Sequence, residues 1–172
     1  MWYYTGKGDQ GDSNLYSGRR ISKGDMVLEL IGTLDEANAH LGMAISLCKT
    51  SELRTDMREI QDHLSKLMGF IAGVKKVELE ENSFLKSATQ WLEKKMNDYG
   101  KSIRNPQAFL NAGETTFGAA IDISRTVIRR AERIAVRHFG VCEGDRKELL
   151  TYLNRLSSFL YILRLFTDQP IS

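Results

Sequence analysis

The sequence predicts an all-α protein, an antiparallel five-helix bundle preceded by a short extended N-terminal segment. Apolar residues recur at helical spacings of three, four and seven over five stretches of the chain. Only two prolines, Pro106 and Pro170, occur, which leaves room for long helices. Little of the remaining chain has the pattern of a strand. Several long helices without a substantial sheet pack as a bundle.

The composition indicates one domain spanning residues 1–172, large enough for its own core. The net charge of +2 is too small to indicate nucleic-acid binding by itself. No run of 18 apolar residues and no secretory-signal pattern occur, so we expect neither a membrane span nor export. Cys48 and Cys142 lack C-x-x-C or zinc-site spacing, and we interpret them as reduced thiols of a cytoplasmic protein.

The first helix is expected to begin at Thr33, because Thr33-Leu34-Asp35-Glu36 has the form of a capping box. The preceding "MVLELIG" alternates, so residues 26–31 are expected to be extended. Asn38 falls within the apolar stripe of this helix, which consists of Leu34, Leu41, Ile45 and Cys48.

Two further helices are predicted over about 52–74 and 83–99, separated by the acidic "ELEEN". The segment "GKSIRNPQAFLNAGE" that follows is a loop, long enough to be functional rather than a mere connection.

The fourth helix is expected to run from near Thr115 to Gly140, a residue that suits a left-handed C-cap. The fifth begins at Asp145, with Glu148 as an acidic partner three residues later. A helix that is apolar on two sides is either central in its bundle or used for oligomerisation. The fifth helix has two apolar stripes. One consists of Leu149, Leu153, Leu156, Leu160 and Leu163, and the other of Tyr152, Phe159 and Phe166.

The stretch "SRTVIRRAERIAVRH", residues 124–138, carries a row of arginines at every fourth position. The row consists of Arg125, Arg129, Arg133 and Arg137. On an isolated helix such a row of like charges costs on the order of 1 kcal/mol. Two explanations remain open at this point. The arginines pair with Asp122, Glu132 or an acidic neighbouring helix, or they bind a polyanion, because the arginine fork suits phosphate oxygens.

The N-terminal "YTGKGDQGDS" looks like a phosphate-binding loop but lacks the Walker A pattern. Gly6 and Gly11 have the Walker A spacing and Ser13 follows, but Asp12 stands where the lysine is required. We therefore reject a P-loop. Either the glycines let backbone N–H groups approach an anion beside Lys7, or the segment is a turning or disordered terminus.

Two single polar residues have a structural and a functional interpretation. Asn154 lies on the helix with two apolar stripes, and a buried amide there requires either a helix–helix hydrogen bond or a ligand. Asp35, expected in the first turn of its helix, is favoured there by the helix dipole alone.

The sequence gives no sign of a metal site or of a nucleophilic triad. A di-iron bundle needs Glu-x-x-His pairs, but the positions three residues before His40, His63 and His138 hold Ala37, Ile60 and Ala135. No G-x-S-x-G motif and no Cys–His nucleophile pattern is present.

Four stretches of the chain together resemble the PduO-type ATP:cob(I)alamin adenosyltransferases. These are "YTGKGDQGDSNLYSGRRISKGD", "LIGTLDEANAHLG", "SRTVIRRAER" and "YLNRLSSFLYILRL", in that order. Residues 50–105 carry little of the resemblance. It implies transfer of the 5′-deoxyadenosyl group of ATP to cob(I)alamin, giving adenosylcobalamin and triphosphate, with Mg²⁺ accompanying ATP. It also implies a homotrimer with active sites between subunits.

The resemblance also implies roles for individual residues. ATP would lie on the N-terminal loop and on the fourth helix, with contacts from Thr5, Gly6, Lys7, Gly8, Asp9, Gly11, Ser13, Lys23, Arg129, Arg130, Glu132, Arg133 and Asn154. Asp35 and Arg125 match a pair that bridges subunits at the active site. Phe109 matches an aromatic residue that closes the lower face of the corrin. The residues implied to act in catalysis are Arg129, Arg125, Asp35 and Asn154.

The sequence departs from the family pattern at several positions. Asp12 replaces the usual Thr of the N-terminal loop, and Ser158 replaces an Asp on the fifth helix. The loop after Phe109 reads Leu-Asn-Ala-Gly instead of Leu-Pro-Gly-Gly, with Asn111 and Ala112 in the two central positions. This puts the rigidity of the loop in question.

The sequence offers two alternatives to a transferase, each from a different class of function. A non-catalytic trimeric bundle that binds ATP or a corrinoid as a sensor or carrier is compatible with the same motifs. A nucleic-acid-binding bundle is disfavoured, because Asp122 and Glu132 break the arginine row. Expected partners are ATP, cobalamin, and a reductase or an adenosylcobalamin-dependent client enzyme, but no nucleic acid and no membrane.

Overall fold

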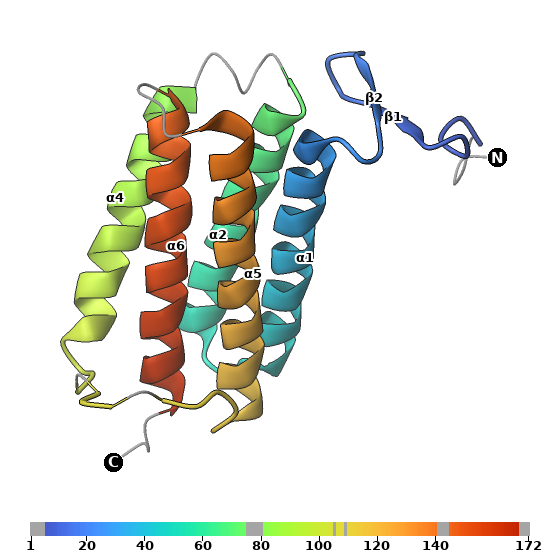
Figure 1. Ribbon diagram of the computed structural model, residues 1–172. Helices are drawn as coiled ribbons and strands as arrows, with labels where there is room; N and C mark the ends of the chain where they lie inside the picture. The colour runs from blue at the N-terminus through green and yellow to red at the C-terminus, as the bar shows by residue number, and fades with distance from the viewer. Residues whose placement is uncertain (1–5, 75–80, 105, 109, 141–144, 169–172) are drawn as a thin grey trace.

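The computed structural model describes residues 6–74, 81–104, 106–108, 110–140 and 145–168, with five long helices among them (Figure 1). The helices are α1 (Met26–Leu47), α2 (Ser51–Ile71), α4 (Glu81–Gly100), α5 (Thr116–Phe139) and α6 (Asp145–Asp168). Successive helices run in opposite directions along the bundle (Figure 1). The prediction of an all-α helical bundle is confirmed.

Helix α5 packs between α1 and α6, while α4 packs on α6 and α2 on α1. Because directions alternate along the chain, the neighbours α4 and α6 point the same way (Figure 1). Both apolar stripes of α6 contribute to the core of the single chain, with Tyr152, Leu153, Leu156, Phe159, Leu160 and Leu163 each at most 1 % exposed. Helix α6 is therefore central in its bundle, and its two stripes give no argument for oligomerisation.

The N-terminal segment forms an arm that leaves one end of α1 and points away from the bundle (Figure 1). It contains a two-stranded antiparallel hairpin, β1 (Asp12–Asn14) and β2 (Arg20–Ser22), in which Ser13 lies opposite Ile21. The arm is attached at its turn, where the backbone N–H of Ser17 donates to the carbonyl of Ala72 at 3.3 Å. Gly73 has φ +79° here, and a Cβ at this position would lie 2.9 Å from the Cβ of Ser17.

Helix α1 begins seven residues earlier than predicted, and residues 26–31 are helical rather than extended. Asp25 is the N-cap and accepts a hydrogen bond from the N–H of Val27 at 2.9 Å. Thr33 lies in the helix interior, where its hydroxyl donates to the carbonyl of Glu29 at 2.7 Å. The predicted capping box is wrong, because Leu30 and Leu34 bury one continuous helical face and packing overrides a local β preference.

The other helix ends agree with the sequence to within a few residues. Thr115 is the N-cap of α5 and accepts from the N–H of Gly118 at 2.9 Å. Gly140 ends α5 with φ +74°. No helix in the described ranges has the length and apolar content needed to cross a bilayer.

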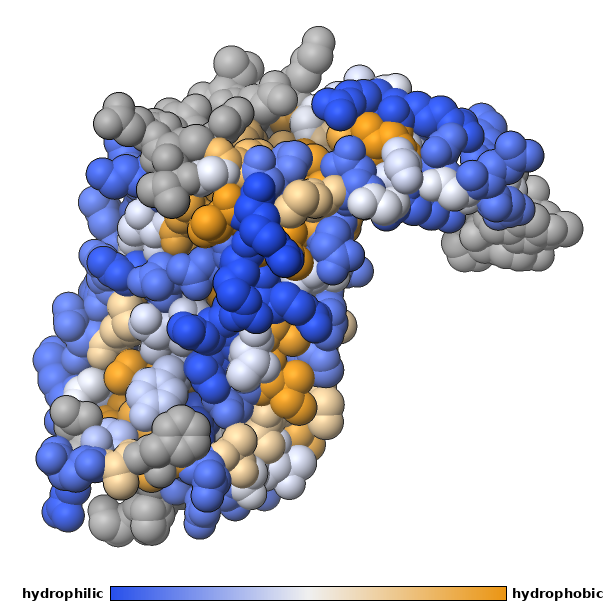
Figure 2. All heavy atoms as spheres, viewed as in Figure 1, coloured by the Kyte–Doolittle hydropathy of each residue, from blue (hydrophilic) through white to orange (hydrophobic). Residues whose placement is uncertain are grey.

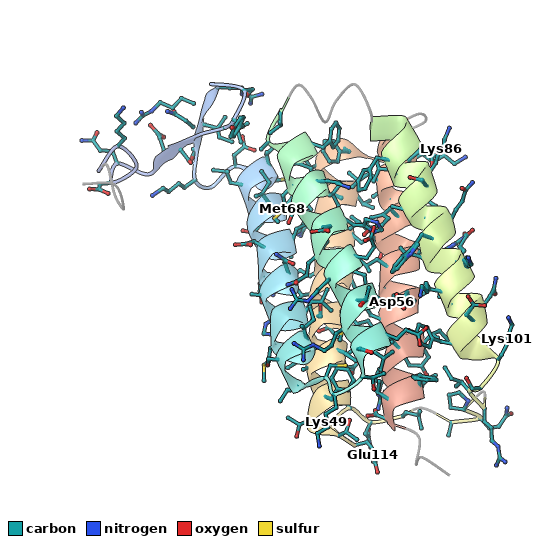
Figure 3. All side chains as sticks on the ribbon, turned by 180° about the vertical axis from the view of Figure 1, so that it is seen from behind. Lys49, Asp56, Met68, Lys86, Lys101 and Glu114 are labelled. Atoms are coloured by element: carbon teal, nitrogen blue, oxygen red, sulfur yellow. The ribbon has the colours of Figure 1, made fainter. Side chains whose placement is uncertain are left out.

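A buried polar group, Asp56, joins α2 to α4 (Figure 3). One carboxylate oxygen accepts from the hydroxyl of Tyr99 at 2.6 Å, and the other pairs with Nζ of Lys95 at 2.7 Å. Burial, followed by the hydrogen bond to Asp56, raises the pKa of Tyr99 well above its usual value. Tyr99 therefore stays protonated and donates to Asp56.

Replacing Asp56 by alanine is expected to lower the free energy of unfolding by about 3 kcal/mol, because it leaves a buried hydroxyl and a half-buried ammonium without their acceptor. Urea unfolding followed by circular dichroism measures this. Asp98→Ala is the control, since the pair between Asp98 and Lys101 is exposed and is worth less than about 1 kcal/mol. Equal losses in the two variants would show that Asp56 does not join the helices.

Candidate functional site

The arginine row lies along α5, and its first member differs from the other three in its contacts. Nε of Arg125 donates to Asp122 at 2.6 Å, and its guanidinium carbon lies 5.9 Å from the ring centre of Tyr161. Within the described residues, Arg129, Arg133 and Arg137 are exposed and have no ion-pair partner. A band of hydrophilic residues follows α5 across this face (Figure 2). Local pairing thus accounts for the first arginine of the row, whereas the charge of the other three is not compensated by any described residue.

A chain of polar contacts runs across α5, α6 and α4 beside the row. The amide of Asn154 donates to Glu132 at 3.2 Å and its oxygen accepts from Arg155 at 3.1 Å. Nε of Arg155 in turn donates to Glu93 at 2.9 Å. Asn154 is exposed, so the expectation of a buried amide is wrong, because this position faces outward between the two apolar stripes. The helix–helix hydrogen bond of the structural interpretation is present, from α6 to Glu132 of α5.

Arg130, the next residue after Arg129, points toward α1 and pairs with Glu36. Both side chains are about half-exposed, but Nε of Arg130 is buried without a hydrogen-bond partner among the described residues. Arg130 is therefore held on the α1 side, whereas Arg129 faces α6 and α4.

Arg125 and Tyr161 line two adjoining hollows in the surface. The larger is an open cleft of about 710 Å³ between α4, α5 and α6, which is a size typical of ligand sites. It is lined by Glu93, Met96, Asn97, Arg125, Arg129, Ser157, Ser158, Tyr161 and Ile162. The smaller, of about 320 Å³, is lined by Leu110, Asn111, Ala112, Asp122, Arg125, Tyr161 and Arg164.

Sequence reasoning missed several members of this cleft, among them Tyr161, Glu93 and Asn97. Tyr161 lies on α6 beside the two apolar stripes. An aromatic residue with a hydroxyl group at the edge of an apolar face could have marked it as a candidate site residue. Glu93 and Asn97 lie on α4, where the sequence carries no recognisable motif.

The N-terminal loop is built from tight turns, in which Asp9 N–H donates to Gly6 O and Gly11 N–H to Gly8 O. Gly6 and Gly11 have φ of +69° and +87°, which glycine adopts without strain. Nζ of Lys23 lies close to Gly8, 3.2 Å from the position of an added Cβ. The predicted loop, including Lys7 and Ser13, and Lys23 are therefore together on the arm.

Asp12, which replaces the usual Thr of the family pattern, forms an ion pair within the hairpin. Its carboxylate pairs with Nε of Arg20 across the hairpin at 3.2 Å. The negative charge that argued against phosphate binding thus has a positive partner within the arm.

The structure does not bring the predicted site residues together within one chain. The arm carries its loop away from the arginine row of the same chain (Figures 1 and 3). Asp35 is exposed in the interior of α1, so the expected position in the first turn is wrong, and no contact joins it to Arg125 in this chain. Thr5, Phe109 and Cys142 lie outside the described residues.

The described residues contain no group of three or more His, Cys, Asp and Glu side chains that could hold a metal ion.

Comparisons with known proteins agree with the features above. The family described as cobalamin adenosyltransferase matches residues 3–167. The corrinoid adenosyltransferase MMAB of Bos taurus is 31% identical over 170 residues, covering 95% of this chain and 70% of the relative. The corrinoid adenosyltransferase PduO of Citrobacter freundii is 30% identical over 178 residues, covering 98% of this chain and 50% of that relative.

Among solved structures, a variant PduO-type ATP:corrinoid adenosyltransferase from Lactobacillus reuteri, complexed with cobalamin and ATP, superposes with a TM-score of 0.84. It is 27% identical, and the match covers 96% of this chain and 90% of that one. With its family profile, its sequence relatives and its fold in agreement, the chain belongs to the cobalamin adenosyltransferase family.

Proposed function

We propose that this chain transfers the 5′-deoxyadenosyl group of ATP to cob(I)alamin, giving adenosylcobalamin and triphosphate. The observation that carries the proposal is the cleft between α4, α5 and α6, into which Arg125 and Arg129 extend from one face of α5. A related enzyme of the same fold has been solved with cobalamin and ATP together.

In the reaction, the reduced cobalt attacks the 5′ carbon of ATP as a nucleophile. The carbon–oxygen bond breaks, and its electron pair leaves with the triphosphate, where negative charge accumulates. Arg129, Lys23 and the N–H groups of the glycine loop would stabilise that charge. No proton is transferred in this step, so the site needs no general base.

The nucleotide site is proposed to comprise the N-terminal loop, Lys23 and the α5 residues Arg129, Arg130, Glu132 and Arg133, with Asn154. Arg129 and Arg133 are exposed and have no ion-pair partner among the described residues, which supports a role in binding phosphate. Mg²⁺ on the phosphates would supply further positive charge, as it commonly does at nucleotide sites.

The N-terminal loop is expected to become ordered around ATP. Amide hydrogen exchange over residues 6–14 should slow at least several-fold on adding Mg-ATP, because the glycine N–H groups would bind phosphate oxygens. The hairpin turn at 15–19, which holds no proposed contact, serves as the internal control. Unchanged exchange in the loop at saturating ATP would remove it from the site.

We propose a site shared between copies in a homotrimer, because one chain separates its glycine loop from its arginine row (Figure 1). Exposed apolar side chains on α1 and α5 support contact between copies. They are Met43, Leu47 and Ile123, which are 49%, 37% and 43% exposed.

Light scattering at micromolar concentration is expected to give three times the chain mass of 19.5 kDa. Met43→Glu combined with Ile123→Glu should shift the mass toward a single chain and abolish turnover, since buried charges oppose association. A wild-type mass of one chain would contradict the shared site.

An anaerobic assay with ATP, Mg²⁺ and chemically reduced cobalamin tests the activity directly. Conversion of the cob(I)alamin spectrum to that of adenosylcobalamin, with release of triphosphate, is the expected result. The alternative is a non-catalytic sensor or carrier, which would bind ATP or the corrinoid without turnover.

We further propose that the chain acts as one domain over residues 1–172 in the cytoplasm. The free thiol of Cys48, buried in the core, supports a reducing compartment. A reductase that supplies the electron and an enzyme that uses adenosylcobalamin are the expected partners. Phe109 is proposed to contact the corrin on the strength of the family resemblance alone.

A further inference from the structure

An ion pair between Arg164 and Asp168 is buried at the C-terminal end of α6. Arg164 is 3% exposed, and its Nε donates to Oδ2 of Asp168 at 2.8 Å. A terminal nitrogen of the same guanidinium donates to the backbone carbonyl of Asn111. One side chain therefore connects α6 to the loop between α4 and α5.

The second carboxylate oxygen of Asp168 extends the network to α5. It accepts from the hydroxyl of Thr115 at 2.7 Å, and this hydroxyl accepts from the N–H of Gly118. Gly118 has no side chain because an added Cβ would overlap the carboxylate of Asp168. The carboxylate thus lies against the positive end of the α5 dipole. We call Asn111, Thr115, Arg164 and Asp168 the Arg164 clamp.

Stability alone does not explain this arrangement. Removing two charges from water is costly, and apolar residues of similar volume in the same place are often equally stable or more so. What the hydrogen-bonded pair adds is geometry, since Arg164 and Asp168 together fix α6, the start of α5 and the loop before it relative to one another. The loop that it fixes has Asn111 and Ala112 where the resemblance leads one to expect Pro and Gly.

The fixed segment is a wall of the smaller hollow. Leu110, Asn111 and Ala112 form one side of this space of about 320 Å³, and Arg125 and Tyr161 connect it to the larger cleft. It is too small for a whole corrin ring but has room for one edge. Its amide and charged groups suit the amide side chains on a corrin rim.

We propose that Arg164 and Asp168 are positioning residues that hold residues 110–112 as a wall for the edge of the corrinoid. This inference rests on the proposed function. The clamp lies at the N-terminal end of α5, whereas the proposed nucleotide contacts lie further along that helix and on the arm. Loss of the clamp therefore weakens corrinoid binding and leaves ATP binding unchanged.

The test compares Arg164→Met, Arg164→Lys and Asp168→Asn with Arg58→Met, which removes an exposed arginine of α2. For each protein, KM is measured separately for cobalamin and ATP, and Kd for cob(II)alamin is measured by spectral titration in the presence of ATP. Thermal unfolding reports on the fold. Arg164→Lys keeps the charge but lacks the fork that reaches Asp168 and Asn111 together.

We expect the three clamp variants to raise KM and Kd for the corrinoid at least tenfold, with KM for ATP changed less than twofold and Arg58→Met indistinguishable from wild type. Equal rises in both KM values, or no rise in either, would overturn the positioning role. It would also be overturned if Arg164→Lys behaved like wild type, or if even Asp168→Asn failed to fold. An inactive wild-type protein would instead refute the proposed function.

Discussion

Arg125→Ala and Asp35→Ala are each expected to lower the adenosylation rate roughly a hundredfold or more. In one chain the two residues do not meet, since Arg125 pairs with Asp122 and Asp35 is exposed on α1. Among the described residues, Asp122 accepts from Nε of Arg125, which leaves the terminal nitrogens of the guanidinium for a second carboxylate. We propose that this carboxylate is Asp35 of a neighbouring copy, beside the corrinoid.

The size of the rate loss distinguishes two interpretations of Arg125 and Asp35. An exposed ion pair is worth at most about 1 kcal/mol, and its loss would change the rate less than about sixfold. A desolvated pair costs about 3–5 kcal/mol when one partner is removed, because the other is left buried and unpaired. The cleft around Arg125 supports the second interpretation.

The measurement is kcat and KM for both substrates in the two single variants and the double variant, with the trimer mass determined for each. The double variant should be little slower than either single one, because the interaction is lost only once. Asp122→Asn, which keeps a hydrogen-bond acceptor beside Arg125, should cost less than either. If both single variants keep most of their rate, or if their losses add, Arg125 and Asp35 do not act as a pair.

Arg129→Ala is expected to reduce kcat by a factor of about 100 to 1000, the usual loss when a donor to developing charge is removed. Arg129 lines the cleft and has no ion-pair partner among the described residues, so its charge is available to the leaving triphosphate.

Arg137→Ala is the matched control, because Arg137 belongs to the same row but lies two turns further along α5 and does not line the cleft. It should keep its rate to within about twofold. Similar losses in both variants would indicate that the row acts through its summed charge, and higher ionic strength should then weaken ATP binding in wild type as well.

Much of the bundle could be predicted from the sequence, because helical periodicity and end signals are local. The stripes of α6, the start of α5 near Thr115 and its end at Gly140 were all in the pattern of neighbouring residues. The start of α1 could not be predicted in this way. "MVLELIG" is compatible with strand or helix, and only the burial of Leu30 against the rest of the core decides between them.

For the candidate site, the sequence by itself determined which residues are candidates: a glycine loop with Lys7 and Lys23, and a row of arginines on one helix. Only the tertiary structure decided how they are used. It placed the loop on an arm away from the row (Figure 1). It formed a cleft between α4, α5 and α6 that Tyr161 lines. It also joined Arg164 to Asn111, 53 positions away in the chain. The physical reason is that motifs record short-range spacing, whereas side chains from different helices meet only after the core has fixed the packing of those helices.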